Sequence, residues 1–327
     1  MSKARNYVFG LGKGGFKWDA NDIAGMVGLP NIGEIFYVDP TAGSDTANGG
    51  KDADDAYATV TQAHSAMSAD NDDLVIVAGT GATGRTSEAA AVTWSKRRTH
   101  IVGNGPARRM NARNGVAAGY SGGTTTAVFT VTGNNCSFTN MSFATFNDNN
   151  ILVDVQADYL TFTNVHFQGI GHADTGDDAN GRSLLITDSG ENEFNNCTIG
   201  LDTVSRGGAA NSSLELTGSC PRNSFRGCLF PMYADGATVT WVKADTGNAF
   251  ERFLIFEDCL FTNATLGSAT TITVGMDLST TGNGQVYCIN CPWYGATDLV
   301  NNVTNLIQAN PVYDTNDQGL MTVHANS

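Results

Sequence analysis

Hydrophobic and polar positions repeat along this chain in a six-residue unit that is clearest at residues 256–261. The unit usually begins with Phe, has Asn, Asp or Gly third and an apolar residue or Cys fourth, and ends with an aromatic residue or Ile. Its six copies start at residues 138, 162, 194, 225, 256 and 288, so the spacings are 24, 32, 31, 31 and 32 residues. A near-constant period of this size predicts repeats that are stable only when stacked.

The third position of the unit predicts a sharp bend. In a regular strand the first and fourth side chains would point to opposite faces, yet both are apolar in the repeat. Asn, Asp and Gly enter the left-handed backbone region more readily than other residues. We therefore predict a strand, a one-residue corner and a second strand, with positions one, four and six pointing inward. The predicted corner residues are Asn140, Asn164, Asn196, Gly227, Asp258 and Asn290.

A second family of apolar runs lies before each copy and predicts a further strand in every repeat. These runs cover residues 127–131, 151–155, 184–186, 214–216, 239–242 and 272–274. Residues 303–307 and 320–323 are expected to finish the stack. The connections outside the corner vary in length, so binding or catalytic residues are expected in loops or on an outward strand face.

The chain before the repeats predicts a cap. Strands are expected at residues 34–40, 74–77 and 100–105, and a helix at 57–67, where Val60, Ala63 and Met67 share one stripe. His64 is expected beside that stripe or in solvent. An amphipathic helix here would cover the open end of a strand stack.

The segments FYVDPTAGSDTANGG, YATVTQAHSAM, DDLVIVAGTG and THIVGNG resemble the opening of parallel β-helix proteins of the pectin-lyase-like superfamily. The resemblance implies an all-β fold, a right-handed single-stranded parallel β-helix with an N-terminal capping helix. We expect an extended attachment arm at residues 1–34 and a β-helix body at 35–327. Within the body, the cap is expected at 35–105, the coils at 106–310 and a closing strand at 311–327.

Charge is distributed unevenly. Residues 1–113 hold 12 basic and 12 acidic residues, and residues 114–327 hold 6 and 20, which accounts for the net charge of −14. Such an acidic body makes nucleic acid an unsuitable partner. The first 18 residues contain basic residues and no acid, which suggests a tether. The predicted partner-binding residues are Lys3, Arg5, Lys13 and Lys17 in this arm, and Arg97, Arg98, Arg108 and Arg109 in a second basic stretch.

Seven cysteines are present, and four of them follow the repeat. Cys197, Cys228, Cys259 and Cys291 occupy the fourth position of successive copies, which predicts a buried core stack, because free Cys packs as a small hydrophobe. Cys288 and Cys291 have CxxC spacing, so metal binding or a redox pair stays an alternative. Reduced thiols suit synthesis in a cytoplasm. No apolar run is long enough to insert in a membrane, and no secretory signal is visible.

The loop at residues 168–180 contains the strongest candidates for catalysis. Asp174, Asp177, Asp178 and His172 could bind a divalent cation or supply the acid and base for cleavage of a glycosidic bond. They could equally form an ordinary solvated turn. An acidic, Gly-rich loop at residues 43–55 is a second possible calcium site, and no other cofactor is expected. The few basic residues after residue 114 match no lyase motif.

The resemblance is specific for fold and weak for function, because the superfamily includes polysaccharide lyases, glycoside hydrolases, phage tailspikes and non-enzymatic virion proteins. With so few catalytic candidates, the leading expectation is a bacteriophage virion protein made in the host cytoplasm. It would be a homotrimeric capsid decoration or cement protein, anchored to capsid or tail proteins by its arm. The alternatives are a tailspike-type depolymerase and a non-catalytic β-helix that binds a host surface glycan.

Overall fold

A computed structural model describes residues 7–8, 17–18, 33–78, 84–105, 110, 114–244, 246–263, 270–279 and 281–309. In the predicted arm, the described residues are the antiparallel pair β1 (Tyr7–Val8) and β2 (Lys17–Trp18) and residues 33–34. The predicted closing strand at 311–327 lies outside the described residues.

The described strands of the body form three parallel sheets, which we call B, C and D. Sheet B contains β3 (Ile35–Val38), β4 (Asp73–Val77), β7 (Thr99–Gly103), β10 (Ser137–Thr139), β13 (Thr161–Thr163), β16 (Glu193–Asn195), β19 (Asn223–Arg226), β22 (Arg252–Glu257), β25 (Gly284–Ile289) and β28 (Leu306–Ala309). Sheet C contains β5 (Arg85–Glu88), β8 (Gly115–Ala118), β11 (Ser142–Ala144), β14 (His166–Gln168), β17 (Thr198–Ile199), β20 (Leu229–Met232), β23 (Leu260–Asn263) and β26 (Trp293–Tyr294). Sheet D contains β6 (Val92–Trp94), β9 (Gly123–Val131), β12 (Asn149–Val155), β15 (Arg182–Thr187), β18 (Ser212–Thr217), β21 (Thr240–Ala244), β24 (Ile272–Leu278) and β27 (Ala296–Val300).

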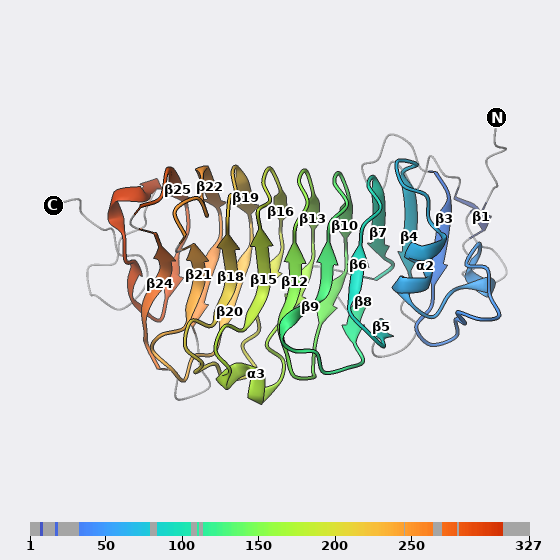
Figure 1. The fold of residues 1–327 in the computed structure, drawn as a ribbon, viewed down its shortest axis with the longest axis horizontal. Helices are drawn as coiled ribbons and strands as arrows, with labels where there is room; N and C mark the ends of the chain where they lie inside the picture. Colours follow the sequence, from blue (N-terminus) through green and yellow to red (C-terminus); the bar gives the residue numbers. More distant parts are fainter. Residues whose placement is uncertain are drawn as a thin grey trace.

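The chain visits sheets B, C and D in turn and then starts the next coil, so each strand pairs with its equivalents in neighbouring coils. Figure 1 shows the coils following one another along the long axis, from β3 at one end to β25 near the other. This is the right-handed parallel β-helix that the repeats and the resemblance predicted. No helix in the described part of the chain is long and apolar enough to cross a membrane.

The one-residue corner lies between sheet B and sheet C, as the repeat predicted. Its six residues have φ between 52° and 63°, the left-handed region. The corner side chains stack, since Asn164 Nδ2 donates to Asn140 Oδ1 at 2.9 Å and Asn290 Nδ2 donates to Asp258 Oδ1 at 3.1 Å. The inward positions on both sides of the corner are buried apolar residues.

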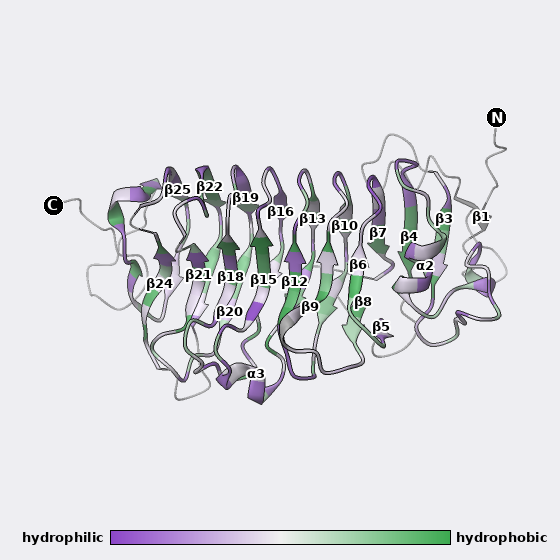
Figure 2. Ribbon diagram, in the orientation of Figure 1, coloured by the Kyte–Doolittle hydropathy of each residue, from purple (hydrophilic) through white to green (hydrophobic). Residues whose placement is uncertain are grey.

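The first position of the repeat builds an aromatic ladder inside the coil. Phe138, Phe162, Phe194, Phe225 and Phe256 pair in register across sheet B. Their successive ring centroids lie 4.8, 4.8, 4.5 and 5.2 Å apart, close to the spacing of neighbouring strands. Burying each ring stabilises the fold by about 1.5–3 kcal/mol. Figure 2 shows hydrophobic residues along the strands and hydrophilic residues at the turns and in α3 (Ala173–Asp177).

The predicted cap helix is α2 (Val60–Ala66), which packs against β3, β4 and β5. Thr59 begins it, and its Oγ1 accepts a hydrogen bond from Gln62 N at 3.1 Å. The buried carboxylate of Glu88 on β5 accepts from Val60 N at 2.9 Å and so satisfies a second free N–H group of the first turn. His64 is buried rather than solvated, and its Nε2 accepts from the backbone N–H groups of Ser95 and Lys96.

Two parts of the secondary structure differ from the sequence prediction. The first two coils contain β5, β6 and β8, whose short sequences RTSE, VTW and GVAA carry no strand pattern that we recognised. At the C-terminal end, the predicted strand at residues 303–307 begins instead with the 3-10 helix η4 (Val303–Asn305) before β28. Asn302 caps η4 by accepting from Thr304 N at 3.1 Å, and this local bond competes with an extended backbone. A further 3-10 helix, η2 (Ala53–Asp55), lies in the loop after β3.

Candidate functional site

The outer face of sheet D carries a column of four charged residues and one leucine, which we call the sheet D column. Asp154, Leu185, Glu215, Lys243 and Asp277 pair in register on β12, β15, β18, β21 and β24. Their chain neighbours on both sides are almost all buried apolar residues, so strand alternation turns the column away from the core. The alternation of apolar residues in each strand could have located these outward positions from the sequence. However, the five residues come from separate repeats and share no motif.

Glu215 lies between two cations at the centre of this column. Arg182 on β15 forms an ion pair with it, and Lys243 Nζ lies 3.4 Å from Glu215 Oε1. Between 5% and 15% of each of these three side chains is exposed. Arg182 also donates to the carbonyl oxygens of Gly181 and Ala210. Ion pairs to two cations hold the Glu215 side chain in place, which suits a binding surface better than a general base.

Asp154 occupies the same column two strands away from Glu215, a backbone separation of about 10 Å. Its oxygens accept from Thr187 Oγ1 at 2.9 Å and from Gln156 Nε2 at 2.6 Å. Burial raises the pKa of Asp154 above the usual value, against the effect of these two donors. The face therefore combines a carboxyl that protonates more easily than usual with a carboxylate held by cations.

Arg206 lies inside the connection between sheet C and sheet D. It is 1% exposed, its Nε and Nη2 donate to Asn211 Oδ1 at 2.9 and 2.6 Å, and its Nη1 donates to Ser213 Oγ at 2.9 Å. Burial lowers its pKa to about 9, and the charge of Arg182 acts in the same direction. Asn211 Nδ2 in turn donates to the carbonyl oxygens of Thr175 and Asp178. Arg206 therefore holds the loops of two coils together beside the sheet D column.

The predicted loop at 168–180 contains the short helix α3, which Figure 1 shows at the edge of the stack. His172 Nδ1 lies 3.7 Å from Asp174 Oδ2, on exposed or half-exposed side chains, while Asp177 is exposed and Asp178 is half-buried. His166 and Gln168 lie apart from these carboxylates, buried on β14, where Gln168 Nε2 is 2.8 Å from His166 Nδ1. The loop therefore brings Asp174 near His172, while His166 belongs to a different network.

That second network lies on the outer face of sheet C. Arg85 on β5 donates to Gln168 Oε1 at 3.0 Å and to Ser142 Oγ at 2.7 Å, so its contacts reach across β8 to β11 and β14. Gly115 lies on the strand between, where a Cβ atom would be 1.9 Å from Ser142 O. The buried Arg85 side chain, hydrogen-bonded to Ser142 and Gln168, therefore fixes the first coils to those that follow.

The acidic loop at 43–55 uses its carboxylates to form the turn before α2. Asp45 Oδ1 accepts from the backbone of Ala58 and Thr59, and Asp55 Oδ2 accepts from Gly49 N at 2.8 Å. Asp52 Oδ1 accepts from the N–H group two residues on. Among the described residues, no group of three or more His, Cys, Asp or Glu side chains is arranged to hold a metal ion.

The basic residues near the cap contact the chain itself. Arg97 Nη2 lies 2.7 Å from Asp70 Oδ2, and Arg98 forms an ion pair with Asp72. Lys96 Nζ donates to three carbonyl oxygens at the C-terminal end of α2. The other predicted partner-binding residues are Lys3, Arg5, Lys13, Arg108 and Arg109, which lie outside the described residues, and Lys17, of which only the backbone is described.

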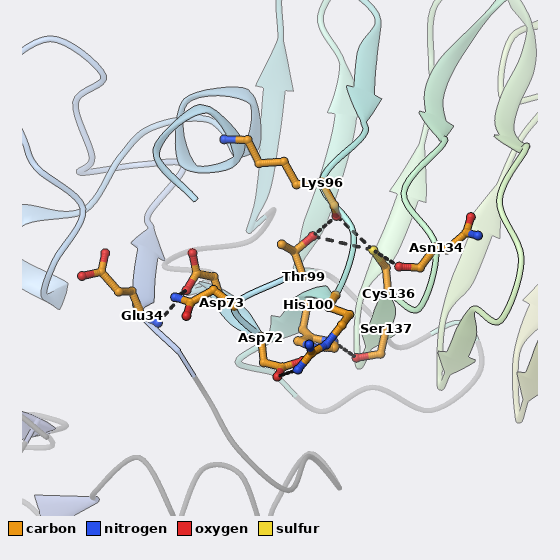
Figure 3. Close-up of polar contacts among 11 residues, drawn as sticks. Glu34, Asp72, Asp73, Lys96, Thr99, His100, Asn134, Cys136 and Ser137 are labelled. Carbon is orange, nitrogen blue, oxygen red and sulfur yellow. Dashed lines mark hydrogen bonds and ion pairs between the residues drawn. The ribbon is translucent and has the colours of Figure 1, made fainter. Parts of the chain in front are cut away.

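Figure 3 shows a further polar cluster on sheet B near the cap. His100 Nδ1 lies 2.8 Å from Ser137 Oγ, and His100 Nε2 lies 3.5 Å from Asp72 Oδ1. Ser137, His100 and Asp72 are thus linked in the order of nucleophile, base and acid that is found in serine hydrolases. However, Asp72 is paired with Arg98, His100 is only 4% exposed, and burial lowers the pKa of its imidazole, which weakens it as a base. We assign the cluster to the attachment of β7 to β10.

Comparison with solved structures shows the fold. The chain is similar to pectin methylesterase PemA from Erwinia chrysanthemi, with a TM-score of 0.52 and 12% identity over 88% of this chain and 84% of that chain. A pectin methylesterase in complex with a hexasaccharide gives the same values. Geobacillus virus E2 ORF18 has a TM-score of 0.45 and 15% identity over 72% of this chain and 49% of that chain. No family model and no curated protein matches the sequence. Structural similarity at this level of sequence identity shows the β-helix fold and does not show an activity.

Proposed function

We propose that this protein is a structural component of a bacteriophage particle, a homotrimeric capsid decoration or cement protein anchored by its N-terminal arm. The contrast in charge between arm and body carries the proposal. The first 18 residues include Lys3, Arg5, Lys13 and Lys17 and no acid, whereas residues 114–327 hold 20 acidic and 6 basic residues. A basic arm is attracted to an acidic capsid or tail surface, while the acidic body is repelled from it and from nucleic acid.

The body has the properties of a rigid spacer. Strands pair in register from β3 to β28 in sheet B, and sheets C and D continue beside it. Ion pairs on the outer surface join neighbouring coils, as in the pair of Arg222 Nη1 and Glu191 Oε1 at 2.8 Å and the contact of Arg226 Nε with Glu257 Oε2 at 3.1 Å. A rigid stack of this kind suits a structural role better than a catalytic one.

Removal of the arm tests the anchoring. A chain lacking residues 1–30 should keep the circular dichroism and unfolding transition of the body but should no longer co-sediment with particles. A full-length variant with Lys3→Gln, Arg5→Gln, Lys13→Gln and Lys17→Gln should bind about tenfold or more weakly at low salt, because its charge attraction is lost. The matched control is Arg222→Gln, which removes one basic charge from the body and should leave binding unchanged. Undiminished particle binding by the shortened chain would contradict the proposal.

The sheet D column favours a second candidate function, the binding of a host surface glycan. Arg182, Lys243 and Glu215 present donors and acceptors on an outward strand face, where an extended sugar chain could lie across successive coils. Polar groups fixed in advance lose little entropy on binding. Because Glu215 is held by cations, we expect retention of the glycan without cleavage.

A panel of host capsule and O-antigen polysaccharides tests this candidate. Lys243→Gln should reduce retention on a bound glycan, whereas Arg226→Gln, on the outer face of sheet B, should not. New reducing ends in the same assay would instead favour a depolymerase, and their loss in Asp154→Asn or Asp177→Ala would distinguish the sheet D column from the α3 loop. Equal retention of wild type and Lys243→Gln would remove the column from consideration.

A further inference from the structure

The cysteine column inside the corner ends with a thiol in a different environment from the rest. Cys197, Cys228, Cys259 and Cys291 occupy the same position in successive coils, and each Sγ donates to the carbonyl oxygen of the ladder residue one coil back, at 3.5, 3.3, 3.4 and 3.3 Å. The first three are buried, but Cys291 is only half-buried. Cys291 is therefore the column member that a small reagent can reach in the folded chain.

Cys288 brings a further thiol to the same place. It takes the first position of the last repeat and pairs in register with Phe256, so a small side chain replaces a ring at the end of the aromatic ladder. The corner at Asn290, with φ of 52°, turns positions one and four into the same region of the core. The register and the corner therefore place the side chains of Cys288 and, one coil back, of Cys259 next to that of Cys291.

Cys291 is a thiol in the structure, where its Sγ donates to the carbonyl oxygens of Phe256 and Ile289, but the neighbouring thiols make its proton easier to lose. Hydrogen bonds from the thiols of Cys259 and Cys288 lower the pKa of Cys291, whereas the contact with Cys291 together with burial raises the pKa of Cys288. The thiolate is the nucleophilic form of cysteine, and accessibility decides which thiolate reacts. Cys228, in the same column and fully buried, has a raised pKa because of desolvation.

We propose that Cys291 is a reactive thiol that exchanges with small disulfides and then forms a disulfide bond with Cys288. In the first step the Cys291 thiolate attacks one sulfur of the small disulfide, forms a mixed disulfide and releases one thiolate. In the second step the sulfur of Cys288 attacks Cys291 Sγ, and the proton of Cys288 passes to the second leaving thiolate. Two protein thiols are oxidised and one small disulfide is reduced to two thiols. This step does not depend on the proposed virion role.

Oxidised glutathione added to the reduced full-length chain tests the proposal by peptide mass spectrometry. Wild type should lose two hydrogens and give a peptide pair joined through Cys288 and Cys291. Cys288→Ser should stop at a glutathione adduct on Cys291, and Cys291→Ser should give neither product. Cys228→Ser is the matched control from the same column, and it should react as wild type does.

Alkylation rates give a second measurement that does not depend on any variant. In the folded chain, iodoacetamide should modify Cys291 about tenfold or more faster than Cys228. In denaturant all seven cysteines should react, which shows that the reagent itself is not limiting. Equal rates at Cys291 and Cys228 in the folded chain, or a disulfide that joins a different pair of cysteines, would overturn the proposal.

Discussion

The corner between sheets B and C and the connections between sheets C and D both carry the chain from one sheet to the next. They do so in different ways. Each corner uses one left-handed residue in every coil from Asn140 to Asn290. The connections between sheets C and D range from the single residue Gly295 after β26 to residues 169–181 after β14. A corner made by a single backbone conformation has to recur, whereas a loop can vary as long as its buried polar groups find partners.

The two regions are also stabilised by different kinds of interaction. At the corner, the backbone conformation and the apolar positions around it are specified by adjacent residues. In the connections, Arg206, Asn211 and Ser213 form a buried network that depends on residues of neighbouring coils. The variable side also borders the sheet D column, so variation is concentrated where binding would take place.

The largest expected effect comes from the aromatic ladder at the corner. Phe194→Ala removes a ring that stacks on Phe162 and Phe225 at 4.8 and 4.5 Å, and should lower the free energy of unfolding by about 3–5 kcal/mol. The control on the loop side is Phe146→Ala, because Phe146 is 54% exposed and should change stability by less than about 0.5 kcal/mol. Denaturant unfolding measures both. Similar losses would remove the energetic contrast between the two regions.

A smaller loss is expected when the corner conformation itself is changed. Asn196→Val places a β-branched residue at φ of 54°, which should cost about 1–3 kcal/mol. Asn195→Val, one residue earlier on an extended strand, is the matched control and should be nearly neutral, because Val suits strands. Asn196→Gly should recover part of the loss. Thermal unfolding of the three variants would refute the role of the left-handed residue if the two Val variants behaved alike.

The loop network should show a loss of about 1–3 kcal/mol that stays local. Arg206→Met removes the donors to Asn211 and Ser213 and leaves their buried oxygens with fewer partners. Amide hydrogen exchange should become faster in residues 200–211 and stay slow in the strands of sheet B. Protection lost equally in both regions would show that the connection is not energetically separate from the stack.

The smallest expected effect is a pH dependence on sheet D. Because burial raises the pKa of Asp154 in the folded state, the stability linked to its protonated form is complete below the unfolded pKa, near 3.8. It is lost as pH rises through the higher folded pKa. Asp154→Asn should remove this dependence, so wild type should lose stability relative to the variant as pH rises above about 3.8. Parallel curves of unfolding free energy against pH would contradict the shift.

The corner was predictable because its requirements are local. Each copy needs a left-handed residue, then a buried thiol or other apolar residue, then a buried ring, at fixed spacing. Because every coil repeats this requirement, the period can be recognised in a single sequence. The cap helix was predictable for a similar reason, since Val60, Ala63 and Met67 share one stripe. The strand at Arg85–Glu88 was not, because its buried charged residues are stabilised by partners distant in the chain, such as Val60 for Glu88.

By itself the sequence determined the repeat, the turn residue, the core positions and the uneven charge, since each depends on neighbouring residues or on composition. Only the tertiary structure decided which charged side chains meet. Arg182, Glu215 and Lys243 are separated along the chain and come together because parallel pairing places successive coils about 4.8 Å apart. The same stacking brought Cys259 beside Cys288 and Cys291, and it separated His166 from the carboxylates that follow it in the sequence.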